Sequence, residues 1–144
     1  MNKFTGVMVL IALFVSGPPS AAVTKVILPH GARPGGSYSP GILTSSTLFI
    51  SGQGGEDQTG KIPREFEAEV KQCLENIGVV LSAAGMSPTD VVSVQVYLTD
   101  ATKFQRMNAV YTSYFTDPRP TRTTVIVAGL VGPGNIEITV TASK

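Results

Sequence analysis

Two segments near the C-terminus place the strongest constraint on how this chain folds. They comprise residues 120–128 and 136–142, and β-branched residues fill most positions of both. Such alternating, β-branched runs are typical of strands. Each run carries one charged residue near its start, Arg122 in the first and Glu137 in the second. A charge in otherwise uncharged surroundings costs free energy unless it has a partner or faces water.

The sequence allows two interpretations of these charges. Most lone charges on strands lie at an edge or an end and face water. Alternatively, Arg122 holds a carboxylate with its planar fork and Glu137 handles protons. If the two strands pair antiparallel through the short connection 129–135, the charges lie at opposite ends of the pair, on the order of 15 to 20 Å apart. A site that uses both charges then needs two subunits.

Residues 1–22 have the features of a secretory signal peptide. Lys3 supplies the positive start, residues 7–15 form an unbroken apolar run, and small residues precede the expected cleavage after Ala22. An ordinary buried N-terminal helix is the alternative. Cleavage leaves residues 23–144 as a single domain. The apolar run is too short to span a bilayer, so we expect an exported protein, periplasmic or secreted, without a membrane segment after cleavage.

The charge balance argues against nucleic acid as a partner. The chain has 11 Lys and Arg and 10 Asp and Glu, and loss of Lys3 leaves ten of each. A near-neutral domain lacks the positive surface that binds phosphate backbones. Cys73 is the single cysteine, and the periodicity of its segment predicts a core position. With one histidine, His30, the sequence shows no cluster of metal ligands.

The remaining pattern predicts an α+β domain. Apolar residues recur every three or four positions over residues 65–84 and 101–115, which predicts two helices. Apolar runs predict a strand over residues 91–98, a strand or tight hairpin over residues 42–51, and a short strand at residues 26–28. This order implies one sheet with both helices on one face. The opposite face is expected to be apolar and covered by oligomer formation.

The first helix separates two strands that we expect to run parallel. A strand at residues 48–51, the helix and the strand at residues 91–98 predict a right-handed crossover. The helix begins with Glu65, Glu67 and Glu69, which favour the positive N-terminal end of a helix. We interpret these three glutamates as a solvated helix start without a chemical role.

Six short motifs follow one another along the chain. They are Tyr38-Ser39-Pro40-Gly41, Ile50-Ser51-Gly52-Gln53, Thr59-Gly60, Asn108 with Tyr111 and Phe115, Pro120-Thr121-Arg122, and Ile136-Glu137-Ile138. In this order they resemble the Rid family, also called YjgF, whose members are reactive-intermediate (enamine and imine) deaminases. The resemblance covers nearly all of the chain after residue 22. Its most specific part is the Pro-x-Arg motif with the x-Glu-x strand that follows it.

This resemblance implies a chorismate-mutase-like fold, a mixed sheet with two helices on one face, assembled as a homotrimer with three clefts between subunits. It implies that Arg122 binds the substrate carboxylate and that Glu137 positions or activates water. The residues implied to line the cleft and contact the substrate are Tyr38, Ser51, Gly52, Asn108 and Thr124. Arg122 and Glu137 of one cleft are expected to come from different chains, in agreement with the strand argument.

The implied reaction is hydrolysis of a short-lived 2-imino or 2-enamino acid to a 2-oxo acid and ammonium. The expected partner is therefore a small carboxylate, and the reaction needs no metal or organic cofactor. Three sequence features depart from the family pattern. Thr124 stands where many deaminase members have cysteine, the segment 115–122 is shorter than in many members, and Leu130-Val131 replaces the usual Leu-Pro.

Two other functions are compatible with the same residues. A binding protein would use Arg122 to hold a carboxylate without turnover. A ribonuclease or translation inhibitor, an activity reported for parts of the family, is disfavoured by the near-neutral charge and by the lack of a catalytic histidine pair.

Overall fold

The computed structural model describes residues 24–29 and 36–144. The predicted signal peptide, residues 1–22, and His30 lie outside the described residues. The strands are β1 (Thr24–Ile27), β2 (Gly41–Thr44), β3 (Thr47–Gln53), β4 (Val91–Leu98), β5 (Thr121–Ile126) and β6 (Ile136–Ser143). The helices are α1 (Phe66–Ala83) and α2 (Phe104–Tyr114), with short 3-10 turns η1 (Pro88–Asp90) and η2 (Ala101–Lys103).

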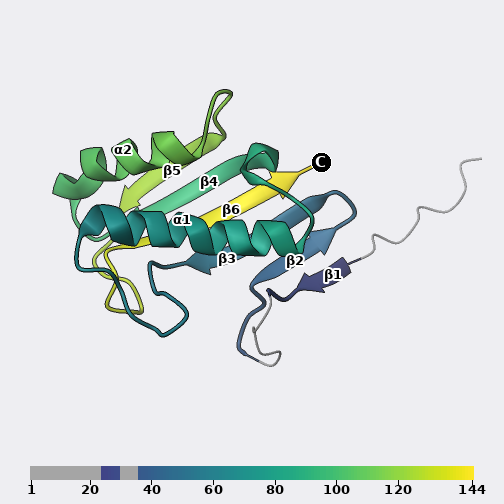
Figure 1. Cartoon of the computed structure of the whole chain (residues 1–144), viewed down its shortest axis with the longest axis horizontal. Helices are drawn as coiled ribbons and strands as arrows, with labels where there is room; N and C mark the ends of the chain where they lie inside the picture. Colours follow the sequence, from purple (N-terminus) through teal and green to yellow (C-terminus); the bar gives the residue numbers. More distant parts are fainter. Residues whose placement is uncertain (1–23, 30–35) are drawn as a thin grey trace, which may run out of the picture.

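The predicted α+β architecture is confirmed: one mixed sheet of six strands carries both helices on the same face (Figure 1). The strand order is β1-β2-β3-β6-β4-β5. Since β3 and β4 each pair antiparallel with β6, they run parallel to each other with β6 between them. The chain passes from β3 through α1 to β4, which confirms the predicted crossover between parallel strands.

The predicted pairing of the last two strands is wrong, because β4 lies between β5 and β6. β5 pairs parallel with β4, and β4 pairs antiparallel with β6. The connection 127–135 is long enough to cross two strand spacings, about 10 Å. Burial explains which strand is central: β6 alternates buried positions along its whole length, whereas no residue of β5 is fully buried.

The N-terminal strands refine two predictions. β2 and β3 form a hairpin, one of the two forms expected for residues 42–51, and Ser45 in its bend has a positive φ of 49°. β1 begins two residues earlier than the expected strand at residues 26–28, because Thr24 pairs with Thr44 and so extends the ladder.

The core lies between the two helices and the covered face of the sheet. Its largest fully buried side chains are Phe115, Ile27, Leu48, Ile50, Leu74, Ile77, Leu81, Leu98, Met107, Ile136, Ile138 and Glu69. Gly85, with φ of 70°, follows α1 in the left-handed conformation common at helix ends. The expected helix 101–115 opens with η2, where the Asp100 carboxylate accepts a hydrogen bond from the Thr102 N–H at 2.8 Å, and α2 begins at Phe104.

The uncovered face of the sheet is more polar than predicted. Strands β6 and β4 present hydroxyl and amide side chains there, namely Thr139, Thr141, Ser93 and Gln95, and the edge strand β5 adds Thr123. Three apolar side chains on the same face are about half exposed, Val26 on β1, Phe49 on β3 and Val125 on β5. The face is therefore a mixture of polar and apolar side chains rather than a continuous apolar surface.

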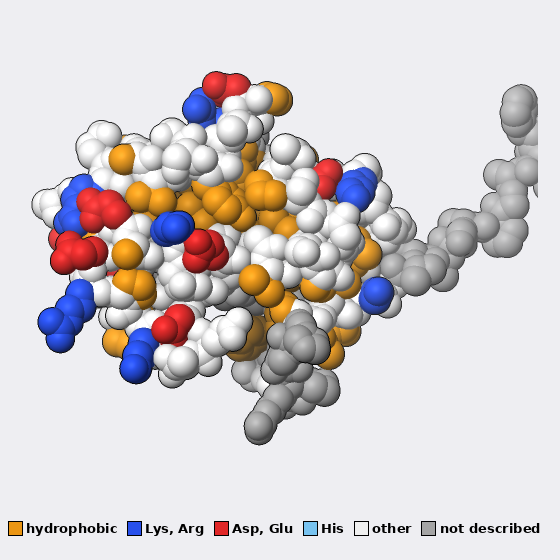
Figure 2. Space-filling model, in the orientation of Figure 1, with side chains coloured by type: hydrophobic (Ala, Val, Ile, Leu, Met, Phe, Trp, Pro, Cys, Tyr) orange, Lys and Arg blue, Asp and Glu red, His pale blue; other side chains and the backbone are white. Residues whose placement is uncertain are grey.

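The helix-covered side shows hydrophobic side chains between α1 and α2 (Figure 2). A hollow here is lined by Glu75, Gly78, Val79, Ser82, Ala83 and Tyr114. No helix within the described ranges is long and apolar enough to cross a membrane.

Candidate functional site

Glu137 lies on the uncovered face of the sheet. Ile136 and Ile138 on either side of it are fully buried, so the alternation of β6 turns the Glu137 side chain away from the core. Across the ladder it lies opposite Tyr97 of β4. The carboxylate therefore lies near the start of a central strand without entering the core.

Strand β3 has an irregularity next to this carboxylate. Its register against β6 shifts between Ile50 and Gln53, at Ser51 and Gly52. A Cβ built on Gly52 would overlap Oε1 of Glu137 and lie 2.7 Å from its Cδ. Glycine at this position lets the carboxylate lie directly against the backbone of β3.

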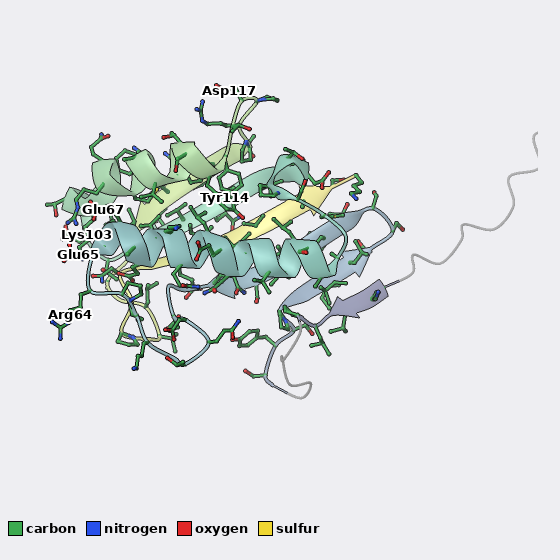
Figure 3. The ribbon with its side chains drawn as sticks, in the orientation of Figure 1. Arg64, Glu65, Glu67, Lys103, Tyr114 and Asp117 are labelled. Atoms are coloured by element: carbon green, nitrogen blue, oxygen red, sulfur yellow. The ribbon has the colours of Figure 1, made fainter. Side chains whose placement is uncertain are left out.

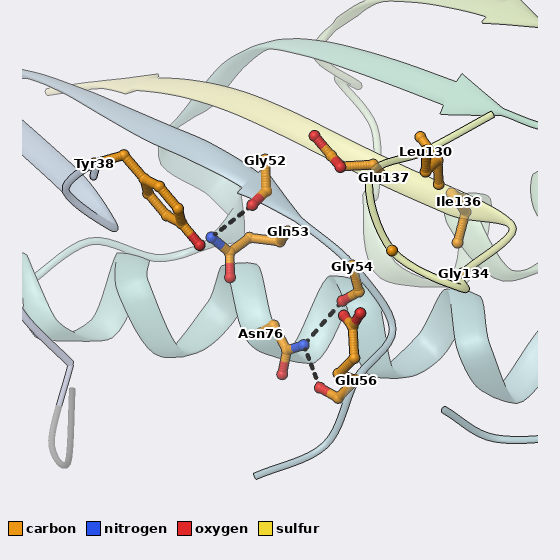
Figure 4. A pocket seen from close by; sticks show the side chains of 11 residues that line it. Tyr38, Gly52, Gln53, Gly54, Glu56, Asn76, Leu130, Gly134, Ile136 and Glu137 are labelled. Atoms are coloured by element: carbon orange, nitrogen blue, oxygen red, sulfur yellow. Dashed lines mark hydrogen bonds between the residues drawn. The ribbon is translucent and has the colours of Figure 1, made fainter. Parts of the chain in front are cut away.

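The Glu137 carboxylate borders a pocket of about 250 Å³ (Figure 4). The lining residues are Tyr38, Gly52, Gln53, Gly54, Glu56, Asn76, Leu130, Gly132, Gly134, Ile136 and Glu137. They come from the segment before β2, the end of β3 and the loop after it, α1, the loop before β6, and the first two residues of β6. Three of the residues implicated by the sequence, Tyr38, Gly52 and Glu137, are thus brought together.

Ser51 holds the Tyr38 segment against β3 and is not among the lining residues. Its backbone N–H and its hydroxyl donate to the Pro40 carbonyl at 3.0 and 3.2 Å, and the hydroxyl accepts from Nε2 of Gln53 at 3.3 Å. Tyr38 is 70% exposed, and its ring points toward Gln53 at the rim of the pocket (Figure 4). Ser51 therefore helps to fix the position of Tyr38.

Two side chains of α1 fix the loop that follows β3. Nδ2 of Asn76 donates to the carbonyls of Gly54 and Glu56, both at 2.9 Å. The fully buried thiol of Cys73 donates to the Gln53 carbonyl at 3.0 Å, and burial raises the pKa of this thiol. The predicted core position of Cys73 is confirmed, and its thiol also anchors one wall of the pocket.

Arg122 lies on the opposite, helix-covered face, level with the buried Val94. Its guanidinium carbon is 4.5 Å from the ring centre of Tyr111 and 5.7 Å from that of Phe104. Its Nη1 lies 3.9 Å from the sulfur of Met107. Among the described residues no carboxylate forms an ion pair with Arg122. The rings therefore hold the guanidinium while leaving donors that can bind the carboxylate of a ligand.

Two buried hydroxyls near Arg122 have no hydrogen-bond partner within the described part of the chain, those of Thr124 and Tyr111. Thr124 follows Arg122 by two residues and shares its face of β5. The Tyr111 side chain is 3% exposed, and burial raises the pKa of its hydroxyl although the charge of Arg122 opposes this shift. Because buried hydroxyls normally have partners, this region fits a site that a ligand or a second chain completes.

Asn108 lies on α2, the helix whose rings contact Arg122, and not in the pocket beside Glu137. Its side chain is half-buried, and its backbone carbonyl accepts a hydrogen bond from the Thr112 hydroxyl at 3.0 Å. The residues implicated by the sequence thus form two groups, one around Glu137 on the uncovered face and one on the helix-covered side.

Arg122 and Glu137 do not meet within one chain. Arg122 is level with Val94 of β4, and Glu137 is level with Tyr97, three residues further along. Two strand spacings across and three residues along place their Cα atoms roughly 14 Å apart. The two side chains also point to opposite faces of the sheet. The two residues are therefore apart, as predicted, but somewhat closer than the predicted distance of about 15 to 20 Å, and neither the position of β4 between the strands nor the opposite faces was predicted.

Three residues that shape the pocket, Gln53, Glu56 and Asn76, were not predicted as site residues, although Gln53 ends the quoted motif Ile50-Ser51-Gly52-Gln53. Gln53 and Glu56 flank the glycine-rich end of β3, which the sequence predicts only as a loop. Asn76 lies beside the buried stripe of α1, so its contact with a loop is set by tertiary packing alone. Within residues 24–29 and 36–144, no three His, Cys, Asp or Glu side chains are grouped to hold a metal ion.

Comparison with known proteins identifies similar sequences and structures. The family model described as Endoribonuclease L-PSP matches residues 30–144. A 2-iminobutanoate/2-iminopropanoate deaminase of Bos taurus is 39% identical over 122 residues, 83% of this chain and 89% of the relative. RidA from the Antarctic bacterium Psychrobacter sp. PAMC 21119 is 33% identical with a TM-score of 0.74, covering 87% and 99% of the two chains. E. coli TdcF with bound serine is 35% identical with a TM-score of 0.71, covering 76% and 89%.

Proposed function

The chain belongs to the family described as Endoribonuclease L-PSP, also called Rid or YjgF, and we propose that it hydrolyses reactive 2-imino or 2-enamino acids to 2-oxo acids and ammonium. Its mixed sheet with two helices on one face matches the solved structures of this family. Support for the reaction comes from the mammalian relative that carries the deaminase name. The serine bound to TdcF has the carboxylate and the α-nitrogen that such a site would hold.

The observation that carries this proposal is that the Arg122 guanidinium has no carboxylate partner among the described residues. It is held by Tyr111 and Phe104. A planar fork without a protein acceptor is suited to bind the carboxylate of a 2-imino acid in a bidentate manner. Because Glu137 lies on the other face, the proposed site combines Arg122 of one subunit with Glu137 of its neighbour.

The proposed reaction requires only two catalytic side chains, Arg122 and Glu137. Arg122 orients the substrate carboxylate, and Glu137 accepts a proton from water as the water oxygen bonds to the imine carbon. That proton passes to the nitrogen, which gives a 2-amino-2-hydroxy acid. Glu137 then accepts the proton of the new hydroxyl group as the carbonyl forms, and this second proton passes to the nitrogen as the carbon–nitrogen bond breaks, which leaves a 2-oxo acid and ammonia, protonated to ammonium in water. Glu137 returns to its ionised form, and neither a metal nor an organic cofactor enters the cycle.

The oligomer and the cellular location are part of the proposal. We propose a homotrimer with a cleft at each subunit boundary, because one chain holds the two charged groups apart. We also propose export by way of residues 1–22. A small carboxylate is the proposed partner, and binding to nucleic acid or membrane is not part of the proposed function.

Two rival functions remain for the experiment to separate. Carboxylate binding without turnover would use the same Arg122 contact. Ribonuclease activity is suggested by the name of the family, Endoribonuclease L-PSP. The near-neutral charge of the chain does not favour this activity, because RNA binding depends strongly on contacts with phosphates.

An ammonia-release assay tests the proposal directly. An amino-acid oxidase generates imines in situ from several 2-amino acids, and the protein is added at catalytic concentration. We expect faster ammonia release with the wild type than with Arg122→Ala. Saturable binding of a 2-oxo acid without any acceleration would indicate a binding protein. RNA cleavage that Arg122→Ala abolishes would indicate a ribonuclease.

A further inference from the structure

Glu69 is the one buried charged side chain within the described residues, with an exposure of 1%. Its position corrects the prediction of a solvated helix start. Glu67 does lie at the surface, where it forms an ion pair with Arg106 at 2.6 Å, but Glu69 falls on the buried stripe of α1 between Phe66 and Cys73. A buried carboxylate is costly unless donors satisfy its oxygens. The hydrogen-bond donors of the Glu69 carboxylate therefore indicate what this residue does.

Both oxygens of Glu69 accept hydrogen bonds from a single residue, Asn135. Oε1 accepts from the Asn135 backbone N–H at 2.5 Å, and Oε2 accepts from Nδ2 of the Asn135 side chain at 2.8 Å. Asn135 immediately precedes β6, and Glu137 is the second residue of that strand. The carboxylate thus holds the chain two residues before the proposed catalytic group.

Other contacts fix the remaining atoms of Asn135. Its Oδ1 accepts from Nζ of Lys103, the last residue of η2. In space this lysine lies near the start of α1, where its Nζ is 5.2 Å from the ring centre of Phe66 (Figure 3). Its backbone carbonyl accepts from the Thr99 N–H at 3.1 Å. The Asn135 amide therefore links the buried anion of Glu69 to the cation of Lys103, so the charge of Glu69 is balanced through one intervening side chain.

Glu69 also lies between the two loops that form the pocket walls. A Cβ on Gly55, in the loop after β3, would lie 2.5 Å from Cγ of Glu69. A Cβ on Gly134, in the loop before β6, would lie 3.2 Å from its Oε1. Gly134 itself lines the pocket, as do Gly54 and Gly132 of the same two loops. The Glu69 side chain thus lies against both loops that form the pocket walls.

We propose that Glu69 is a positioning residue that acts through Asn135 to hold the start of β6, and with it the Glu137 carboxylate, in the pocket. As far as it concerns turnover, this inference rests on the proposed function of Glu137. The two hydrogen bonds from Asn135 to Glu69, called the clamp below, are a property of the fold, and hydrogen exchange can detect them without any assay of activity. Displacement of a catalytic group by about 1 Å can lower a rate by about a hundredfold, so a clamp at this point affects turnover strongly.

An exchange of the two functional groups tests the clamp. Asn135→Asp replaces the amide with a carboxylate that faces Glu69 and repels it. Glu69→Gln replaces one acceptor oxygen with an N–H₂ donor. The Asn135 side chain then cannot both accept from Lys103 and donate to residue 69. The double variant Glu69→Gln/Asn135→Asp restores the pattern: the introduced glutamine accepts from the backbone N–H and donates to the introduced aspartate, which pairs directly with Lys103. We expect the double variant to recover what each single variant loses.

Two measurements are made on all variants. The first is amide hydrogen exchange of segment 132–137, which should become faster in Asn135→Asp and return to the wild-type rate in the double variant. The second is imine hydrolysis, for which we expect kcat to fall by about ten- to a hundredfold in Asn135→Asp and to recover in the double variant. KM should change less than kcat, because Arg122 of the neighbouring subunit supplies the carboxylate contact.

Each outcome supports or overturns the inference. Unchanged exchange and kcat in Asn135→Asp would show that Glu69 does not act through Asn135. Recovery of exchange protection without recovery of kcat would show a purely structural clamp and overturn the positioning role. If the wild type hydrolyses no imine, the proposed function fails, while the exchange measurement still decides whether the clamp exists.

Discussion

The carboxylate of Glu137 lies against the backbone of Gly52, so closely that a Cβ on Gly52 would overlap Oε1 and lie 2.7 Å from Cδ. The contact arises because the register of β3 shifts at this point and because β6 turns Glu137 to the uncovered face. Gly52 therefore defines where this carboxylate can lie.

The first prediction is that Gly52→Ala lowers imine hydrolysis by about tenfold or more, because the added methyl group displaces Glu137 from the pocket. The measurement is ammonia release under steady-state conditions. Gly129→Ala is the matched control, since a Cβ at Gly129 meets no atom within 4 Å. Equal activity of the two variants would mean that the position of Glu137 is not important for turnover.

Local patterns were sufficient to predict most of the fold. Strand β4 was expected at residues 91–98 and is found at Val91–Leu98, because strand-forming residues fill the segment, although its register against β6 shifts between Val91 and Ser93. Helix α1 was predicted to within one residue at each end, since its apolar stripe and Gly85 are both local signals. The order of strands was not predictable in this way: whether β6 pairs with β5 or passes β4 depends on contacts between distant segments.

The candidate site was predicted only in part for the same reason. The motifs indicate Tyr38, Gly52 and Glu137, and the fold brings these three together. Glu69 was misassigned because its acidic neighbours suggested a solvated helix start. Its spacing from Phe66 and Cys73 places it on the buried stripe, but its partner Asn135 is 66 residues away along the chain. The site roles of all the residues indicated by the motifs, Tyr38, Gly52 and Glu137 included, stay predictions.

The second prediction concerns the division of the site between subunits. Arg122→Ala and Glu137→Ala are each expected to be inactive. When they are co-expressed in equal amounts, each cleft of a mixed trimer has about one chance in four of combining an intact Arg122 with an intact Glu137 from the neighbouring subunit. About a quarter of wild-type activity should therefore return.

Light scattering provides the control for this experiment, because the mixed sample must remain trimeric. Mixed trimers without activity would indicate that both residues act from one chain. A stable monomer at micromolar concentration would contradict the composite site altogether.

The third prediction is that Arg122→Lys retains the charge but loses most of the activity. A lysine supplies a point charge where the planar fork is needed, and the loss of one charge-assisted hydrogen bond corresponds to about a ten- to hundredfold decrease in kcat/KM. The stacking on Tyr111 is weakened as well. Near wild-type turnover of Arg122→Lys would exclude a bidentate contact with the substrate.

The fourth prediction concerns the N-terminus. If residues 1–22 are a signal peptide, the exported protein begins at Val23. N-terminal sequencing of the protein recovered outside the cytoplasm decides the point. Intact Met1 on the recovered protein, or complete retention in the cytoplasm, would show that these residues are not a cleaved export signal.

The last prediction separates an enzyme from a binding protein. Glu137→Gln keeps the shape of the side chain and its place against Gly52, but it removes the basic carboxylate. If Glu137 accepts a proton from water, turnover should fall by about a hundred- to ten-thousandfold. The affinity for a stable 2-oxo acid should change far less, because Arg122 of the neighbouring subunit supplies that contact.

Calorimetric titration with the 2-oxo acid measures the affinity and is made on the same preparation as the kinetic assay. If Glu137 is the base, turnover must fall while the affinity for the 2-oxo acid is largely retained. A variant that hydrolyses imines as fast as the wild type would place water activation elsewhere. A variant that loses binding and turnover together would show that Glu137 maintains the shape of the cleft, since a group that acts only on water leaves product affinity intact.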